Sequence, residues 1–249
     1  MKYSILLITT IILTLSVSVS AQNIQGTVHY SSKSKVHVLI NTEGFNENMK
    51  EKFKTGYEAS SRKQHVLEFT KNKSLFTEKK EVNINPSRGM RSNPKGPALM
   101  INFPGSYYKD LIEKTYVNQK EFFGRQFIIR NTLKTINWKK ENEIKTIGKY
   151  TCFKATTKSI KENGETTDVV AWYTIDIPVQ EGPGKYWGLP GLILEIQTED
   201  VVFTCTKITL NQTSSNAIKI PNKGKKISRT KFEKLFVSTL KEIKERHAN

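Results

Sequence analysis

The feature that most constrains the fold is a succession of short β-rich runs separated by turn residues. Strand-like runs cover residues 24–40, 63–80, 107–129, 135–160, 168–179 and 192–211. Between two of these runs lies Asn163-Gly164, a residue pair that tight hairpin turns favour. Short runs bounded by turn signals at this spacing predict a sheet of consecutive, mostly antiparallel strands.

Two amphipathic segments predict helices beside this sheet. Along residues 45–62 an apolar side chain recurs every four residues, which marks one face of a helix. Near the C-terminus, Thr230 and Glu233 have the spacing of a capping box, and an apolar stripe follows. We therefore expect an α+β fold: a mostly antiparallel curved sheet or half-open β-barrel, with an early helix and a C-terminal helix packed on it.

The first 21 residues have the pattern of a secretory signal peptide. Met1-Lys2 precedes an apolar run that ends in Ser-Val-Ser-Ala, which predicts cleavage before Gln22. The alternative is a transmembrane anchor, but the run is near the lower limit for spanning and no basic stop-transfer cluster follows it. We expect residues 22–249 to form a single β-rich domain, because no linker or internal repeat divides them.

The chain is strongly basic, with 40 Lys and Arg against 23 Asp and Glu and a formal net charge of +17. Such an excess favours contact with anionic surfaces, and an anionic membrane surface is an expected partner. Nucleic acid is not expected for an exported chain. Because the lysines are spread along the whole sequence, a generally basic, solvated surface is the alternative interpretation.

The two cysteines, Cys152 and Cys205, both lie in strand-like segments. In an oxidising compartment such a pair predicts one disulfide, with two buried free thiols as the alternative. A catalytic cysteine is not expected, because none of the four histidines stands in a motif that would mark a base for it. The histidines are scattered and the cysteines far apart, so no metal site and no cofactor are predicted.

The most unusual stretch is "EGPGKYWGLPGLILEIQ", residues 181–197. Its first glycines and proline predict a sharp turn, and Pro190 followed by Gly191 matches the requirement of a type II turn. Residues 192–196 carry leucine and isoleucine on both faces, which predicts a strand buried on both faces. The stretch is neither a dinucleotide-binding loop, since a strand follows it, nor a nucleophile elbow, since no serine lies between its glycines.

Two interpretations of this stretch remain open. In the first it is a double turn packed against the sheet, and in the second its aromatic side chains line the mouth of a ligand pocket. The candidate ligand-binding residues are Trp172, Tyr186, Trp187, Gly188, Leu189, Pro190 and Gly191.

The sequence "GPGKYWGLPGLILEI" resembles the hallmark of the GLPGLI family, whose hexapeptide is complete at residues 188–193. Residues 66–76, 136–157 and 171–179 resemble the same family, so the resemblance covers most of the chain after residue 21. It implies an exported protein of Bacteroidetes-type bacteria that is periplasmic, outer-membrane-associated or secreted. It implies no activity and no catalytic residues.

Together these patterns favour a non-catalytic cell-envelope protein that binds an apolar or amphipathic ligand in the curved sheet. The expected ligand is a lipid, a lipoprotein segment or a peptide. The main alternative is a structural or interaction module that docks by a sheet edge. A hydrolase is less expected: acidic residues flank the stretch, but such residues beside strands are mostly solvated. They are Asp168, Asp176, Glu181 and Glu195.

Overall fold

A computed structural model describes residues 24–35, 62–79, 105–122, 124–160, 166–211 and 217–248, without the side chains of residues 240 and 243–248. The expected signal peptide lies outside the described residues. So does the early helix expected over residues 45–62, apart from Arg62, which begins a strand. Among the described residues, no helix has the length and apolar character needed to cross a membrane.

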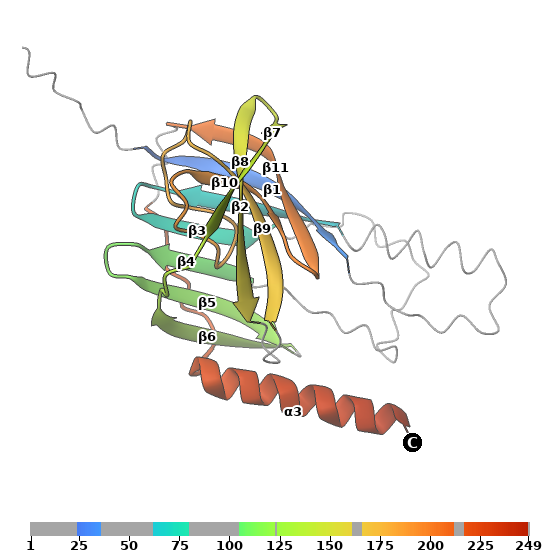
Figure 1. The fold of residues 1–249 in the computed structure, drawn as a ribbon. Coiled ribbons are helices and arrows are strands. Elements are labelled where there is room, and N and C mark those ends of the chain that lie inside the picture. Colours follow the sequence, from blue (N-terminus) through green and yellow to red (C-terminus); the bar gives the residue numbers. More distant parts are fainter. Residues whose placement is uncertain are drawn as a thin grey trace, which may run out of the picture.

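The described chain is mostly β, as predicted, with a C-terminal helix (Figure 1). The elements are β1 Gly26–Ser34, β2 Arg62–Phe69, β3 Lys73–Glu78, β4 Ser106–Asp110, β5 Thr115–Phe122, β6 Arg125–Thr132, β7 Lys139–Ile147, β8 Tyr150–Ile160, β9 Thr166–Thr174, β10 Leu192–Gln197, β11 Val201–Leu210, β12 Lys225–Lys226 and α3 Arg229–Ala248. They form a 12-stranded sheet in the order β12-β6-β5-β4-β3-β2-β1-β11-β10-β9-β8-β7. Every described pairing is antiparallel except that of β12 with β6.

The connection from β6 to β7 requires this sheet to curl. The two strands lie ten positions apart in the sheet, which is about 48 Å in a flat sheet. Only residues 133–138 join them, and a chain of that length reaches at most about 25 Å. The sheet therefore bends until its two ends approach each other, and Figure 1 shows β7, β8 and β9 crossing the direction of β2 to β6.

The main apolar core lies on one face of the sheet. Alternate residues of each strand point into it, so Trp172 joins this core while the next residue, Tyr173, joins a second cluster on the opposite face. Strand β10 is buried at its first five positions, as its apolar sequence predicts. The main core consists of Val28, Tyr30, Leu67, Phe69, Phe76, Tyr107, Tyr116, Phe127, Ile129, Cys152, Trp172, Ile177, Val179, Leu192, Leu194, Val201, Phe203 and Phe232.

Helix α3 covers the β6 end of the sheet, but its cap differs from the prediction. The Oγ of Ser228, and not that of Thr230, accepts the backbone N–H of Lys231 at 3.3 Å. Glu233 instead forms an ion pair with Arg229, with Oε1 and Nε 2.7 Å apart. The capping-box spacing was therefore misleading, because a better-placed serine lies just ahead of the first helical residue.

The strand-and-turn pattern was predicted incompletely between residues 107 and 129. These residues form one strand-like run in the sequence, but Gly124 lies at a bend with a φ of 72°. A further turn at residues 111–114 was missed, and it divides the region into three strands. Lys114 adopts a φ of 49° in that turn, a conformation that no glycine or asparagine in the sequence signals.

Candidate functional site

Residues 175–191, here called the glycine-proline segment, form a closed loop between β9 and β10. The backbone N–H of Leu192 donates to the carbonyl of Ile177 at 3.0 Å, and that of Ile193 donates to the carbonyl of Glu181 at 2.9 Å. A further bond joins the N–H of Gly188 to the carbonyl of Gln180 at 3.1 Å. These backbone hydrogen bonds join the two arms of the segment. They therefore fix the position of its tip, residues 182–188, relative to β10.

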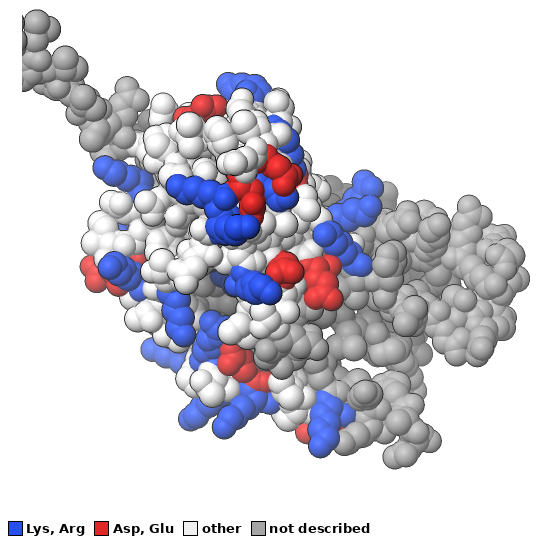
Figure 2. Space-filling model, in the orientation of Figure 1, with Lys and Arg blue, Asp and Glu red and all other residues white. Residues whose placement is uncertain are grey.

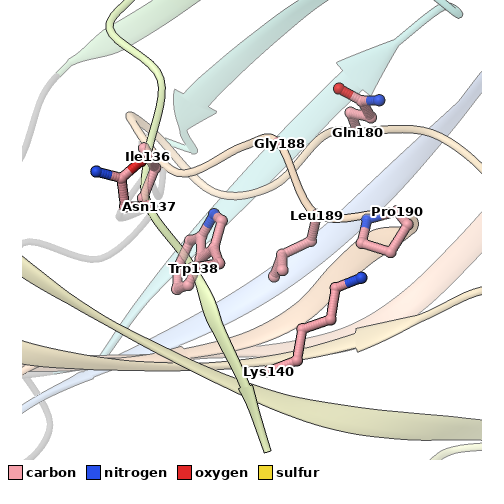
Figure 3. Close-up of a pocket in the computed structure, with 8 residues that line it drawn as sticks. All are labelled: Ile136, Asn137, Trp138, Lys140, Gln180, Gly188, Leu189 and Pro190. Carbon is pink, nitrogen blue, oxygen red and sulfur yellow. The ribbon is translucent and has the colours of Figure 1, made fainter.

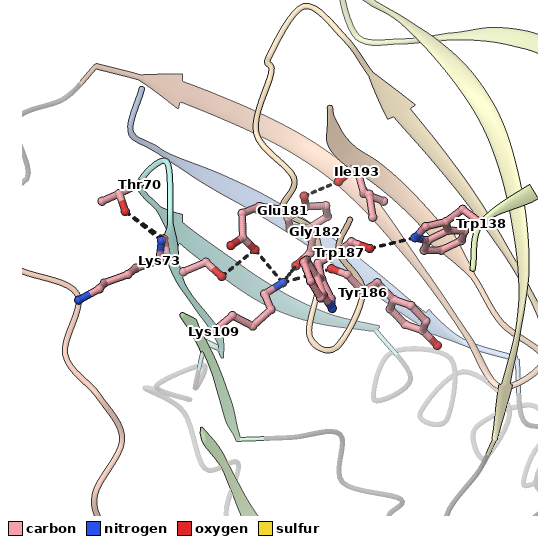
Figure 4. A network of polar contacts seen from close by, with 11 residues as sticks. Thr70, Lys73, Lys109, Trp138, Glu181, Gly182, Tyr186, Trp187 and Ile193 are labelled. Atoms are coloured by element: carbon pink, nitrogen blue, oxygen red, sulfur yellow. Dashed lines mark hydrogen bonds and ion pairs between the residues drawn. The ribbon is translucent and has the colours of Figure 1, made fainter. Parts of the chain in front are cut away.

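A buried ion pair joins this segment to the middle of the sheet (Figure 4). The Nζ of Lys109, on β4, lies 2.8 Å from the Oε2 of Glu181, and both side chains are 0 % exposed. Lys109 also donates to the carbonyls of Gly182 and Tyr186, at 3.0 and 3.1 Å. The hydroxyl of Ser74, on β3, donates to the same carboxylate oxygen at 2.8 Å.

All three N–H groups of Lys109 therefore have acceptors, which allows a lysine to be buried. Burial lowers the pKa of Lys109 from its ordinary value, and the Glu181 carboxylate opposes this change. The other carboxylate oxygen, Oε1 of Glu181, is buried with no hydrogen-bond partner among the described residues. On the neighbouring side the hydroxyl of Tyr30 donates to the carbonyl of Ile193 at 2.6 Å, which fixes the end of the segment to β1.

The turn at Pro190-Gly191 is not the predicted type II turn. That turn requires a positive φ at its second central residue, and Gly191 is not among the described residues with a positive φ. Glycine is required there for space, because a Cβ at position 191 would lie 2.0 Å from the carbonyl oxygen of Thr174. The positive φ occurs instead at Gly188, with 92°, and at Gly184, with 57°.

The space beneath the tip of the segment is filled with side chains. Tyr186 and Leu189 are 8 % and 1 % exposed, and they pack with Tyr173, Ile193 and Ile196 of β9 and β10. Among the described residues, these side chains occupy the space directly beneath residues 186–189. The double-turn interpretation describes these inward-facing residues better than the pocket-mouth interpretation does.

A groove lies on the outside of the segment instead (Figure 3). The connection at residues 136–138 crosses beside it, where the indole N–H of Trp138 donates to the carbonyl of Trp187 at 2.9 Å. The groove is open to solvent and has a volume of about 450 Å³. We call it the outer groove, and its lining residues are Ile136, Asn137, Trp138, Lys140, Gln180, Gly188, Leu189 and Pro190.

The outer groove contains only part of the predicted ligand-binding set. Gly188, Leu189 and Pro190 line it. Trp187 contributes its backbone carbonyl, which accepts a hydrogen bond from the lining residue Trp138. Trp172 does not belong to it, because its ring lies in the main core with the Nζ of Lys145 4.4 Å from the ring centroid. Sequence analysis missed the other wall, residues 136–140, because nothing in that stretch indicates that it crosses from one end of the sheet to the other.

The disulfide predicted between Cys152 and Cys205 is not formed. Both residues are free thiols, on strands separated by β9 and β10 in the sheet. Burial raises the pKa of each thiol to about 11, so neither is a thiolate nucleophile near neutral pH. The alternative of two free thiols, at least partly buried, describes them correctly.

One serine–histidine contact was not anticipated. The Oγ of Ser32 lies 2.9 Å from the Nε2 of His65, as in the first two members of a hydrolytic triad. However, the Nδ1 of His65 has no hydrogen-bond partner among the described residues, and its ring stacks on Phe76. Burial lowers the pKa of His65 to about 4, and the pair is better described as part of the core.

The four candidate carboxylates do not form one described cluster. Glu181 pairs with Lys109, Glu195 with Lys145, and Asp168 with Lys158. Asp176 is exposed near the start of the glycine-proline segment. Each of the first three carboxylates thus has its own lysine.

Comparisons with known proteins give a family match and a distant likeness of fold. A family model described as "Protein of unknown function (Porph_ging)" matches residues 158–195, which contain β9 and the glycine-proline segment. Comparison with curated proteins gave no match. The chain is similar to two crystal forms of PNGF-II, in space groups C2 and P21, with 15 % and 14 % identity and TM-scores of 0.49 and 0.48. The aligned regions cover 84 % and 85 % of this chain but only 32 % of each PNGF-II chain, so this chain spans about a third of their length.

Proposed function

We propose that this is an exported, non-catalytic cell-envelope protein of the GLPGLI type that binds an amphipathic chain segment in the outer groove. The ligand class is a peptide or the peptide part of a lipoprotein. The observation that carries the proposal is the outer groove itself, formed where the hexapeptide meets the connection from β6 to β7. Its volume of about 450 Å³ lies within the range of ligand sites in proteins.

The chemistry of the lining favours an extended peptide over a wholly apolar molecule. Trp138, Leu189 and Pro190 offer apolar contacts, while Asn137 and Gln180 offer amide groups that can pair with a peptide backbone. The side chain of Lys140 is directed toward Pro190, where it can pair with a carboxylate of the ligand (Figure 3). A segment with alternating apolar and acidic side chains matches this arrangement.

The floor of the groove is rigid, which lowers the entropic cost of binding. Leu189 is 1 % exposed, and the segment that carries it is fixed by the Lys109–Glu181 ion pair. A ligand can therefore bind to this surface without opening the core. A lipid held beneath the segment would instead have to displace the buried side chains that pack against Tyr186.

A charge reversal in the groove tests the proposal. The probe is a fluorescein-labelled peptide of alternating leucine and glutamate, measured by fluorescence anisotropy with the chain from residue 22 to 249. Lys140→Glu should weaken binding of this peptide by about tenfold, because a like charge would face the ligand. Lys139→Glu is the matched control: it changes the net charge equally, but Lys139 does not line the groove and lies 3.1 Å from Glu141.

The control should change the affinity less than twofold, and a leucine–lysine peptide should bind far more weakly than the leucine–glutamate peptide. Equal losses from the two variants would assign the binding to overall charge and would overturn the groove as its site. No saturable binding of the acidic peptide would overturn it as well.

The second candidate function is an interaction module that docks through β7, which lies at one end of the sheet order. Ile144 on this strand is 61 % exposed, and the register with β8 is irregular between Lys140 and Ile144. Lysines on an edge strand commonly oppose such pairing, and β7 begins with two. The groove is therefore the better-supported site.

A further inference from the structure

Exposed positive charge concentrates at the end of the sheet formed by β6, β12 and the start of α3. Residues 217–241 contain eight Lys and Arg and one Glu, whereas residues 166–211 contain two Lys and six Asp and Glu. Figure 2 shows lysine and arginine side chains gathered along the lower edge of the molecule, where Figure 1 places β6 and α3. Residues 217–241 therefore carry a denser positive charge than residues 166–211.

The fold brings these cations together because residues 217–232 wrap around the edge of β6. Ile218 packs on one face of the sheet, in a cluster that contains Ile128. The chain then forms β12, which pairs in parallel with residues 127 and 128 at the sheet edge. Phe232 packs on the opposite face, with its ring centroid 5.6 Å from that of Phe127. The side chains between these anchors project from one end of the molecule.

Eight of the cations at this end are exposed and form no ion pair with a described residue; we call them the basic rim. Arg229 is excluded because its guanidinium pairs with Glu233. The basic rim consists of Arg125, Arg130, Lys219, Lys223, Lys225, Lys226, Lys231 and Lys234.

Two exposed aliphatic side chains accompany the basic rim. Ile220 is 47 % exposed and Val237 is 46 % exposed, and each lies within three residues of a rim lysine. Cations beside exposed aliphatic groups suit the boundary between lipid headgroups and acyl chains, where phosphates and hydrocarbon are both within reach. Nucleic acid offers the phosphates without a counterpart for the aliphatic groups.

We propose that the basic rim docks the protein on an anionic lipid surface, with phosphate headgroups as the groups it contacts. This inference rests on the proposed export to the cell envelope. It assigns the membrane contact to the end of the sheet at β6 and leaves the outer groove, which lies beside β7, for a different ligand.

Vesicle co-sedimentation tests the rim. The chain from residue 22 to 249 should bind vesicles of phosphatidylcholine mixed with phosphatidylglycerol, and bind pure phosphatidylcholine vesicles weakly. The triple variant Lys223→Glu, Lys225→Glu and Lys226→Glu should lower the partition coefficient by at least about tenfold, because each basic residue near the surface contributes separately. The triple variant Lys219→Glu, Lys231→Glu and Lys234→Glu should lower the partition coefficient similarly. Because it leaves both residues of β12 unchanged, its loss of binding could not be caused by disruption of that strand.

The matched control reverses three exposed lysines away from the rim, Lys149, Lys158 and Lys207, and should lower the partition coefficient less than about threefold. An equal loss in this control would overturn the rim as the docking surface. Tighter binding to duplex DNA than to the anionic vesicles at the same ionic strength would overturn the lipid assignment. Lys140→Glu should leave vesicle binding unchanged, because Lys140 lines the outer groove and not the basic rim. Vesicle binding therefore tests the rim, and peptide binding tests the groove, independently of each other.

Discussion

Lys109→Met should lower the free energy of unfolding by about 3–5 kcal/mol, because it leaves the Glu181 carboxylate buried without its cation. For a domain of this size that loss corresponds to a decrease in Tm of roughly 6–20 °C. The variant also removes the donors to the carbonyls of Gly182 and Tyr186. Chemical and thermal denaturation of the chain from residue 22 to 249 measures both quantities.

Two comparisons make this result specific to the buried pair. Lys73→Met removes a half-exposed lysine whose Nζ lies 3.5 Å from Asp110, and it should cost less than about 1 kcal/mol. The double variant Lys109→Met with Glu181→Met should recover a substantial part of the loss, since replacing both partners removes the unpaired charge. A loss at Lys109 no larger than that at Lys73 would contradict the assigned role of the pair.

Gly191→Ala should destabilise the protein by about 3 kcal/mol, at the upper end of the usual cost of overpacking. The added Cβ would lie 2.0 Å from the carbonyl oxygen of Thr174 and 2.6 Å from its carbonyl carbon. Thr174 pairs with Leu192 in the sheet, so the backbone there has little room to move. The expected decrease in Tm is roughly 6–12 °C.

Gly188→Ala provides the control within the same hexapeptide. A Cβ there meets no atom within 4 Å, and only the φ of 92° opposes the substitution. Its cost should be about 1–2 kcal/mol, from backbone strain alone. If the two alanine variants had the same Tm, or if Gly188→Ala had the lower Tm, steric exclusion at Thr174 would not explain the glycine at position 191.

The sheet was largely predictable from the sequence because local patterns determine its strands. Alternation and turn residues indicated the runs that contain β2 with β3 and β10 with β11, and Asn163-Gly164 indicated the antiparallel pairing of β8 with β9. The C-terminal helix followed from its apolar periodicity, although Ser228 caps it in place of Thr230. These features depend on residues close together in the chain, which is the information that a single sequence carries best.

The candidate site was less predictable because its contacts are distant in sequence. Lys109 follows two tyrosines in a five-residue strand and precedes an aspartate, which is also the pattern of a solvated strand end. Its burial depends on Glu181, 72 residues later, and no local pattern links the two. The groove wall at Trp138 likewise depends on the connection that spans the curled sheet.

The disulfide prediction failed for a related reason. Cysteine number and compartment suggested the pairing, but the strand order decides which cysteines can meet. Two strands separate the strands of Cys152 and Cys205. Of the two interpretations left open for residues 181–197, the sequence could not select one, because it does not show that Tyr186 and Leu189 pack inward on β9 and β10.

The central claim is that Tyr186 and Leu189 fill the space beneath the tip of the glycine-proline segment, and that the outer groove is left for the ligand. The most direct measurement follows the indole N–H signals of the three tryptophans by NMR during titration with the leucine–glutamate peptide. Trp138 and Trp187 flank the groove, while Trp172 lies in the main core. The account predicts that the Trp138 and Trp187 signals shift with a common saturation curve and that the Trp172 signal stays in place; a shift of Trp172 with the other two unmoved would contradict it.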